Sequence, residues 1–186
     1  MANRIDITTL DEPEQQKWVN LISNNISEDM IKEHIRRFQE LHSPPLFYVW
    51  HLQKMQEMEQ RIGQRLPMYD GFKNIPKVFM TYNKKVIQNI PLSDIPQEER
   101  TNPTNPLRTR APPEPIEWTC PALGNARLDD EDDTVGMSIL GYHAEFHNFR
   151  GGILVNGGSP AAPIFYCFHV FLTDIYQDWK SCRQQS

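Results

Sequence analysis

Apolar residues recur at helical spacing along several stretches of the chain. Residues 11–25 show this spacing weakly and predict a first helix. Ser27 suits an N-cap position, so a second helix is predicted to begin there and to end before Pro44, which cannot continue it. A third helix is predicted over residues 46–62, and Gly63 is the residue expected to end it.

The helical pattern is lost over residues 66–136. Prolines recur there and residues 129–133 are acidic, so we expect a long irregular insertion over about residues 71–136, with a short strand near 78–80. Loops of this length inside a compact domain are uncommon and are usually functional.

Helical spacing returns in the C-terminal third. One apolar stripe begins at Ile139 and is broken by Gly151 and Gly152, and a last helix is predicted over residues 164–179. The expected fold is therefore mainly α: a single domain over residues 1–186, with a four-helix bundle at its core and long irregular loops outside it.

Composition narrows the classes of function. A net charge of −5 leaves no basic face for the phosphates of a nucleic acid, and no apolar run is long enough to cross a membrane. The first residues lack the apolar core of a secretory signal, which favours a cytoplasmic chain or one already processed. The three cysteines, an odd number without a CxxC pair, predict neither a disulfide framework nor a zinc site built on cysteine; they are Cys120, Cys167 and Cys182.

The six histidines are the unusual feature of the chain. One histidine on the apolar face of a helix is usually a core residue with satisfied nitrogens, but all six lie on or beside a core-facing stripe. Such a set, without paired thiolates or converging carboxylates, suits copper, zinc, iron or nickel, and the residues alone predict a site with more than one ion. The candidate ligands are His34, His42, His51, His143, His147 and His169.

The region of the first three histidines resembles the first copper signature of the tyrosinase and catechol oxidase family. That signature has a histidine, then Phe, Trp and a second histidine, with Glu downstream; here these are His42, Phe47, Trp50, His51 and Glu59. His34 stands where some short members carry their first ligand, and residues 66–71 are similar to the Leu-Pro-Tyr-Trp-Asp-Trp that commonly follows.

The region of the last three histidines resembles the second copper signature of the same family. The similar positions are His143, His147, Gly151, Gly152, Ser159, Pro160, Pro163, Ile164, Phe165, His169 and the closing Trp179. The resemblance covers residues 34–70 and 139–179 and leaves the insertion between them without a counterpart.

The resemblance implies a type-3 copper protein with two copper ions at the centre of the helical core and dioxygen as co-substrate. It implies an enzyme that oxidises a small phenolic substrate, turning an o-diphenol into an o-quinone, with monophenol or aminophenol hydroxylation in a biosynthetic pathway also open. Whether a partner protein loads the copper stays open. The implied ligands are His34, His42 and His51 for one ion and His143, His147 and His169 for the other.

Several positions depart from the family pattern. Leu52 stands where the family usually has Arg, Ala162 and Thr173 replace two Asp residues, and Phe168 replaces a histidine. Acidic groups at such positions normally orient the ligand imidazoles, so their loss predicts a weaker site. Ala144 replaces an Asn that members active on monophenols often carry, which favours diphenol oxidation.

Two other interpretations fit the same residues. The first is a non-catalytic relative that binds oxygen or copper or has a structural role, which the missing acidic groups favour. The second is a different metalloenzyme, with zinc or iron in a helical bundle. Carboxylates directed at the core would favour iron, and Glu59 and Glu145 are the candidates for that role.

Overall fold

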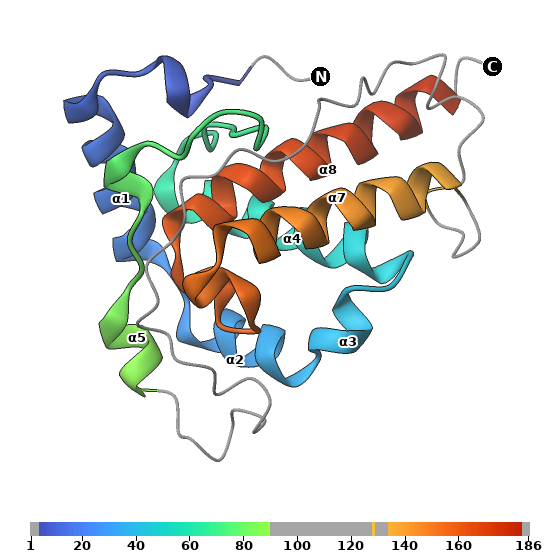
Figure 1. Ribbon diagram of the computed structural model, residues 1–186, viewed down its shortest axis with the longest axis horizontal. Coiled ribbons are helices and arrows are strands. Elements are labelled where there is room, and N and C mark those ends of the chain that lie inside the picture. Colours follow the sequence, from blue (N-terminus) through green and yellow to red (C-terminus); the bar gives the residue numbers. More distant parts are fainter. Residues whose placement is uncertain (1–3, 90–127, 129–133, 184–186) are drawn as a thin grey trace.

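The computed structural model, which describes residues 4–89, 128 and 134–183, is mostly helical (Figure 1). The predicted mainly α class is thereby confirmed. No strand forms within the described part of the chain, where Asp6 and Met68 make an isolated bridge. The α-helices are α1 (Glu12–Asn25), α2 (Glu28–Arg36), α3 (Phe38–Leu41), α4 (Leu46–Ile62), α5 (Lys84–Asn89), α7 (Thr134–Arg150) and α8 (Pro163–Arg183).

The predicted ends of the N-terminal helices have clear physical causes. The Ser27 side chain accepts a hydrogen bond from the Met30 N–H, and this capping starts α2 at the predicted residue. Gly63 ends α4 in a left-handed conformation with φ of 71°, which a glycine adopts without strain. These boundaries are confirmed.

Three expectations about local structure are wrong. The second predicted helix is divided in two, because Arg37 leaves helical geometry (φ −110°, ψ 18°) between α2 and α3. The strand near 78–80 is instead the 3₁₀ turn η2 (Lys77–Phe79), closed by hydrogen bonds to residues three positions back rather than to a neighbouring strand. The insertion contains α5, and α7 begins well before the stripe at Ile139.

Most of the insertion, residues 90–127 and 129–133, lies outside the described residues, as do the acidic run and Cys120. Of the other cysteines, Cys167 is a buried free thiol, whereas Cys182 is disulfide-bonded. The cysteine count predicted no disulfide framework, and the disulfide bond of Cys182 was not expected from the sequence. No described helix has the length and apolar character needed to cross a membrane.

Helices α7 and α8 run alongside each other in Figure 1. Both pack, together with α4, through aromatic side chains, and α8 is buried along most of its length. Tyr48 of α4 stacks on Tyr176 of α8 with ring centroids 4.9 Å apart. Phe146 of α7 stacks on Phe168 of α8 at 3.6 Å. Rings of this size bury large apolar areas and fix the three helices relative to one another.

Two arginines tie distant segments to these helices. Arg150, fully buried at the end of α7, donates to the carbonyl oxygens of Gly71 and Lys73 and to the Tyr69 hydroxyl. Arg4, ahead of α1, forms ion pairs with Glu59 of α4 and with Asp174 of α8.

Candidate metal centre

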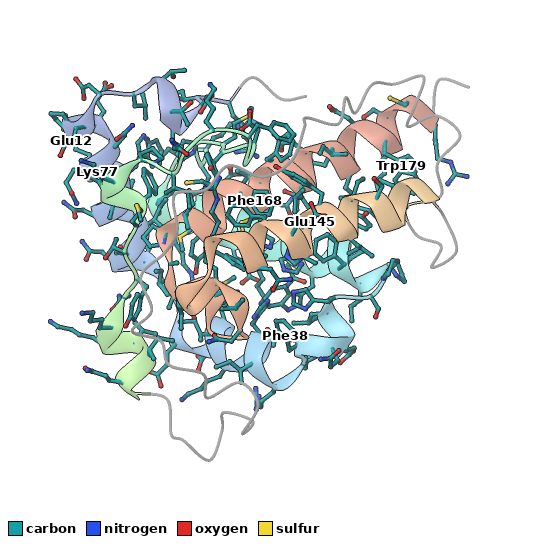
Figure 2. All side chains as sticks on the ribbon, viewed as in Figure 1. Glu12, Phe38, Lys77, Glu145, Phe168 and Trp179 are labelled. Atoms are coloured by element: carbon teal, nitrogen blue, oxygen red, sulfur yellow. The ribbon has the colours of Figure 1, made fainter. Side chains whose placement is uncertain are left out.

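The structure brings all six histidine rings into one cluster. His34 comes from α2, His42 from the end of α3, His51 from α4, His143 and His147 from α7, and His169 from α8. Figure 2 shows the cluster region between Phe38, on the α3 side, and α7, the helix that carries Glu145. The cluster therefore draws on both halves of the chain.

Contacts between neighbouring rings make the cluster continuous. The centroids of His34 and His42 are 5.1 Å apart, and those of His143 and His147 are 4.4 Å apart. The ring of His51 stacks on that of His169 at 4.6 Å, with 12° between the planes, and this pair joins the two halves.

Main-chain carbonyl groups fix the orientation of most of these rings. A carbonyl oxygen only accepts hydrogen bonds, so a ring nitrogen bonded to one carries the proton. Five rings place Nδ1 2.5–2.7 Å from such an oxygen: His34 with Gly157, His42 with Phe38, His51 with Phe47, His147 with Leu154 and His169 with Phe165. In these five rings, Nε2 is left with the lone pair that a metal ion requires.

Three of the Nε2 atoms are buried and lack a partner within the described part of the chain. Those of His34, His51 and His147 have no hydrogen-bond partner among the described residues. The Nε2 atoms of His143 and His169 lie 3.1 Å apart and, without an ion between them, are hydrogen-bond partners of each other. Two nitrogens that bind one ion at about 2.0–2.1 Å would lie roughly 3.3 Å apart at a tetrahedral angle, so this pair has the spacing of ligands to one ion.

The grouping of the ligand atoms agrees with one predicted triplet and differs from the other. One atom from each of His34, His42 and His51 lies within 4.8 Å of the others. The second group at this spacing is His51, His143 and His169, so His51 takes the place expected for His147. The cause is the stacking of His51 on His169 together with the hydrogen bond that holds His147 to Leu154.

Burial keeps the cluster uncharged. Removal from water holds the pKa values of His34, His51, His143 and His169 well below their usual range, and each neighbouring imidazole would add repulsion. Burial likewise lowers the pKa of His147 to about 3. Neutral imidazoles are the form that binds metal ions, so the site is in its binding form at neutral pH.

The carbonyl groups are the functional feature that the sequence analysis missed. The family pattern places carboxylates in this orienting role, and their loss predicted a metal site of lower affinity. Three of the carbonyls belong to the residue four positions before the histidine in the chain, namely Phe38, Phe47 and Phe165. Every residue has a main-chain carbonyl, so these acceptors leave no signal in the sequence. The carbonyl groups of Leu154 and Gly157 come from the segment between α7 and α8, and no sequence pattern near the histidines predicts them.

The substituted positions pack without reaching the ring nitrogens. The Thr173 hydroxyl donates to the Val170 carbonyl, and Ala162 is buried before α8. Phe168 stacks on Phe146. The two acidic candidates also lie elsewhere, because Glu59 is paired with Arg4 and Glu145 is exposed.

A cleft of about 750 Å³ opens onto one side of the cluster. Three ligand candidates line it, namely His42, His143 and His147. The rest of its described lining is uncharged and comprises Phe38, Ser43, Pro44, Leu140, Gly141, Ala144, Asn148, Leu154 and Val155. The arrangement can admit a small uncharged molecule to the edge of the cluster.

Comparisons of the chain with protein-family models, with curated proteins and with solved structures found no match in any of the three.

Proposed function

We propose that this protein binds two copper ions through its six histidines and uses dioxygen to oxidise a small phenolic substrate. In this proposal α2, α4, α7 and α8 form a four-helix core around the metal pair. His34, His42 and His51 hold one ion and His143, His147 and His169 hold the other, with His51 leaving its present grouping when both ions are bound. Bound copper supplies reversible electron transfer to dioxygen.

One observation carries the proposal: three buried Nε2 atoms of the cluster, those of His34, His51 and His147, have no hydrogen-bond partner within the described residues. Beside them, the Nε2 atoms of His143 and His169 lie 3.1 Å apart, within hydrogen-bond distance of each other. A buried polar atom without a partner costs about 1–3 kcal/mol, so several together need a compensating interaction. A cation bound by these lone pairs provides one, and the spacing suits ligands of a single ion.

The protein itself would position the ligands, exclude water and bind the substrate. The carbonyl groups hold the imidazoles in the neutral tautomer that presents Nε2. Rings such as Phe165, whose centroid lies 3.9 Å from that of His169, shield the far side of the cluster from water. The cleft leads substrate to the side formed by His42, His143 and His147.

The lining of the cleft favours diphenols as substrates. Hydroxylation of a monophenol needs a base to take the phenolic proton. Ala144 lies in the cleft, and no carboxylate is present in the described lining. An o-diphenol needs less help: each molecule loses two electrons and two protons to become an o-quinone, and two such oxidations reduce one dioxygen to two waters.

The carboxylate positions argue against the iron interpretation. Glu59 is neutralised by Arg4, and the groups of potential ligands among the described residues contain histidine alone. An all-histidine set suits copper or zinc better than a non-haem iron site, which usually includes a carboxylate.

The test is reconstitution of the metal-free protein with excess copper, followed by elemental analysis, absorption spectroscopy and a catechol assay. We expect two copper ions per chain, an intense near-ultraviolet band on adding hydrogen peroxide, and quinone formation from catechol. Zinc-loaded protein is the matched control, because zinc fills the same ligands and undergoes no redox change.

Fewer than two copper ions per chain would contradict the proposed site. Two ions with the peroxide band but no oxidation of any catechol would favour the non-catalytic oxygen-binding relative instead.

A further inference from the structure

The five carbonyl-bonded imidazoles fall into two kinds. His42, His51 and His169 donate to the carbonyl of the residue four positions earlier, so the local chain orients them. His34 and His147 donate instead to Gly157 and Leu154. These two carbonyls belong to one short stretch, residues 152–158, which we call the bridging segment.

The bridging segment is packed tightly into the molecule. It contains the 3₁₀ turn η5 (Gly152–Val155) and a turn in which the Asn156 side chain accepts a hydrogen bond from the Gly158 N–H at 2.9 Å. All of its residues are buried except Val155. A segment held in this way can fix the positions of its carbonyl oxygens.

Gly157 allows this segment to approach α2 closely. A Cβ atom at this position would lie 2.9 Å from Cα and 3.1 Å from Cγ1 of Ile35, the residue after His34. The first contact is with main chain and cannot be relieved by rotating a side chain. Glycine therefore lets its own carbonyl oxygen reach 2.7 Å from Nδ1 of His34.

We propose that the bridging segment is a single positioning element that sets one imidazole in each proposed triplet, with Gly157 as its key residue. The inference rests on the proposed metal site for its functional meaning. Its structural content is narrower: a displacement at Gly157 moves the hydrogen-bond partner of His34 directly, and it moves that of His147, the Leu154 carbonyl, through the two residues between them. The two metal positions are thus coupled through protein that touches both.

The first test uses Gly157→Ala in the metal-free protein, with ¹H–¹⁵N correlation spectra of the histidine rings. We expect His34 and His147 to lose the signature of a fixed Nδ1–H tautomer, whereas His42, His51 and His169 keep theirs. Val155→Ala is the matched control, because it changes the exposed side chain of the same segment and leaves the carbonyls in place. It should leave all five signatures intact.

The inference is overturned if no ring changes, if all five change alike, or if His34 changes alone. Should Gly157→Ala not fold, Asn156→Ala takes its place, because it removes the acceptor of the Gly158 N–H without adding a clash. The same pair of rings is expected to respond, by a smaller amount.

The second test is copper titration of wild type and Gly157→Ala. Loss of an orienting partner typically lowers the affinity of a metal site about 10–100-fold, and we expect the affinity for each of the two ions to fall within that range. If wild type binds two ions and the variant binds them equally well, the inference fails while the proposed function stands. If wild type does not bind two ions but the ring spectra respond as expected, the proposed function fails and the positioning role stands.

Discussion

The two proposed triplets are assembled in different ways. His34, His42 and His51 come from three separate elements, and their ligand atoms already lie within 4.8 Å of one another. The other triplet takes two rings from one helix, α7, and two of its members, His143 and His169, group with His51 instead.

The difference shows what convergence requires. Three elements that pack independently can each direct one ring at a common point. Two rings one turn apart on a single helix project side by side, and His147 is further held by the Leu154 carbonyl. His51 belongs to both groupings, but the first triplet is closer to its proposed binding geometry. We therefore expect the first copper equivalent to bind at the first triplet.

The largest effect should come from removing the shared ring. We expect His51→Ala to lose the ion of the first triplet and to weaken binding of the other, because the His51 ring also stacks on His169 of the second triplet. His147→Ala should lose one ion and keep the other. Copper content after reconstitution and dialysis distinguishes the two outcomes.

Gln56→Ala, on the exposed side of the same helix as His51, is the control and should retain both ions. Full retention of the second ion by His51→Ala, with unchanged affinity, would show that the triplets are independent and would contradict the sharing of His51.

Acid should destabilise the metal-free protein through the same rings. Above about pH 6.5 an imidazole is neutral in both folded and unfolded chains, so it adds no pH dependence. Below that pH the unfolded chain takes up protons that the buried rings refuse, because burial lowers their pKa values. Each such ring lowers the free energy of unfolding by up to about 1.4 kcal/mol per pH unit, and for His147 this continues to about pH 3.

Urea unfolding at pH 7.5, 6.5 and 5.5 measures this loss, which should unfold the metal-free protein within one to two pH units below 6.5. His147→Ala should flatten the dependence more than His42→Ala, because burial lowers the pKa of the partly exposed His42 less far. Equal flattening by the two variants, or an unchanged stability at pH 5.5, would contradict the prediction.

A smaller effect is expected from Arg150, which anchors the helix of the second triplet. Arg150→Met removes the donor to the Gly71 carbonyl and one of the two donors to the Lys73 carbonyl, which keeps the Tyr69 hydroxyl. We expect a loss of about 2 kcal/mol in the free energy of unfolding. The affinity for the copper ion at His143, His147 and His169 should fall more than the affinity for the other ion. Urea unfolding of the metal-free variant, and copper titration, provide the two measurements.

Arg36→Met is the matched control, since Arg36 is exposed on α2, and it should change stability by less than about 0.5 kcal/mol. An equal loss of affinity for both ions in Arg150→Met would contradict this prediction and would indicate a general loosening of the core.

Helix boundaries were predicted correctly where a capping residue marks them. Ser27 and Gly63 begin and end helices at the expected residues, because a cap depends on a few neighbouring atoms. The prediction of a strand near 78–80 was wrong because so short an apolar run is equally compatible with a 3₁₀ turn. Helix α5 was missed because its six residues are too few to show an apolar stripe.

The candidate site divides in the same way. The sequence predicted which histidines face the core, since helical periodicity decides this, and it predicted one of the two groupings found. It could not predict the support for His34, because the Gly157 carbonyl lies 123 residues away in the chain and reaches the ring only through tertiary packing. That copper is the metal, and that phenols are the substrate, stay predictions.

The residues ahead of α1 connect α4 and α8 through the ion pairs of Arg4. Arg4, whose side chain is 6% exposed, supplies the positive charge beside Asp174, which is 3% exposed. A recombinant chain shortened to begin at α1 would leave that carboxylate enclosed without a counter-charge, a change that commonly costs about 3–5 kcal/mol. Trimming the amino terminus would thus loosen two helices that carry histidines of the cluster, at a distance from every one of those rings.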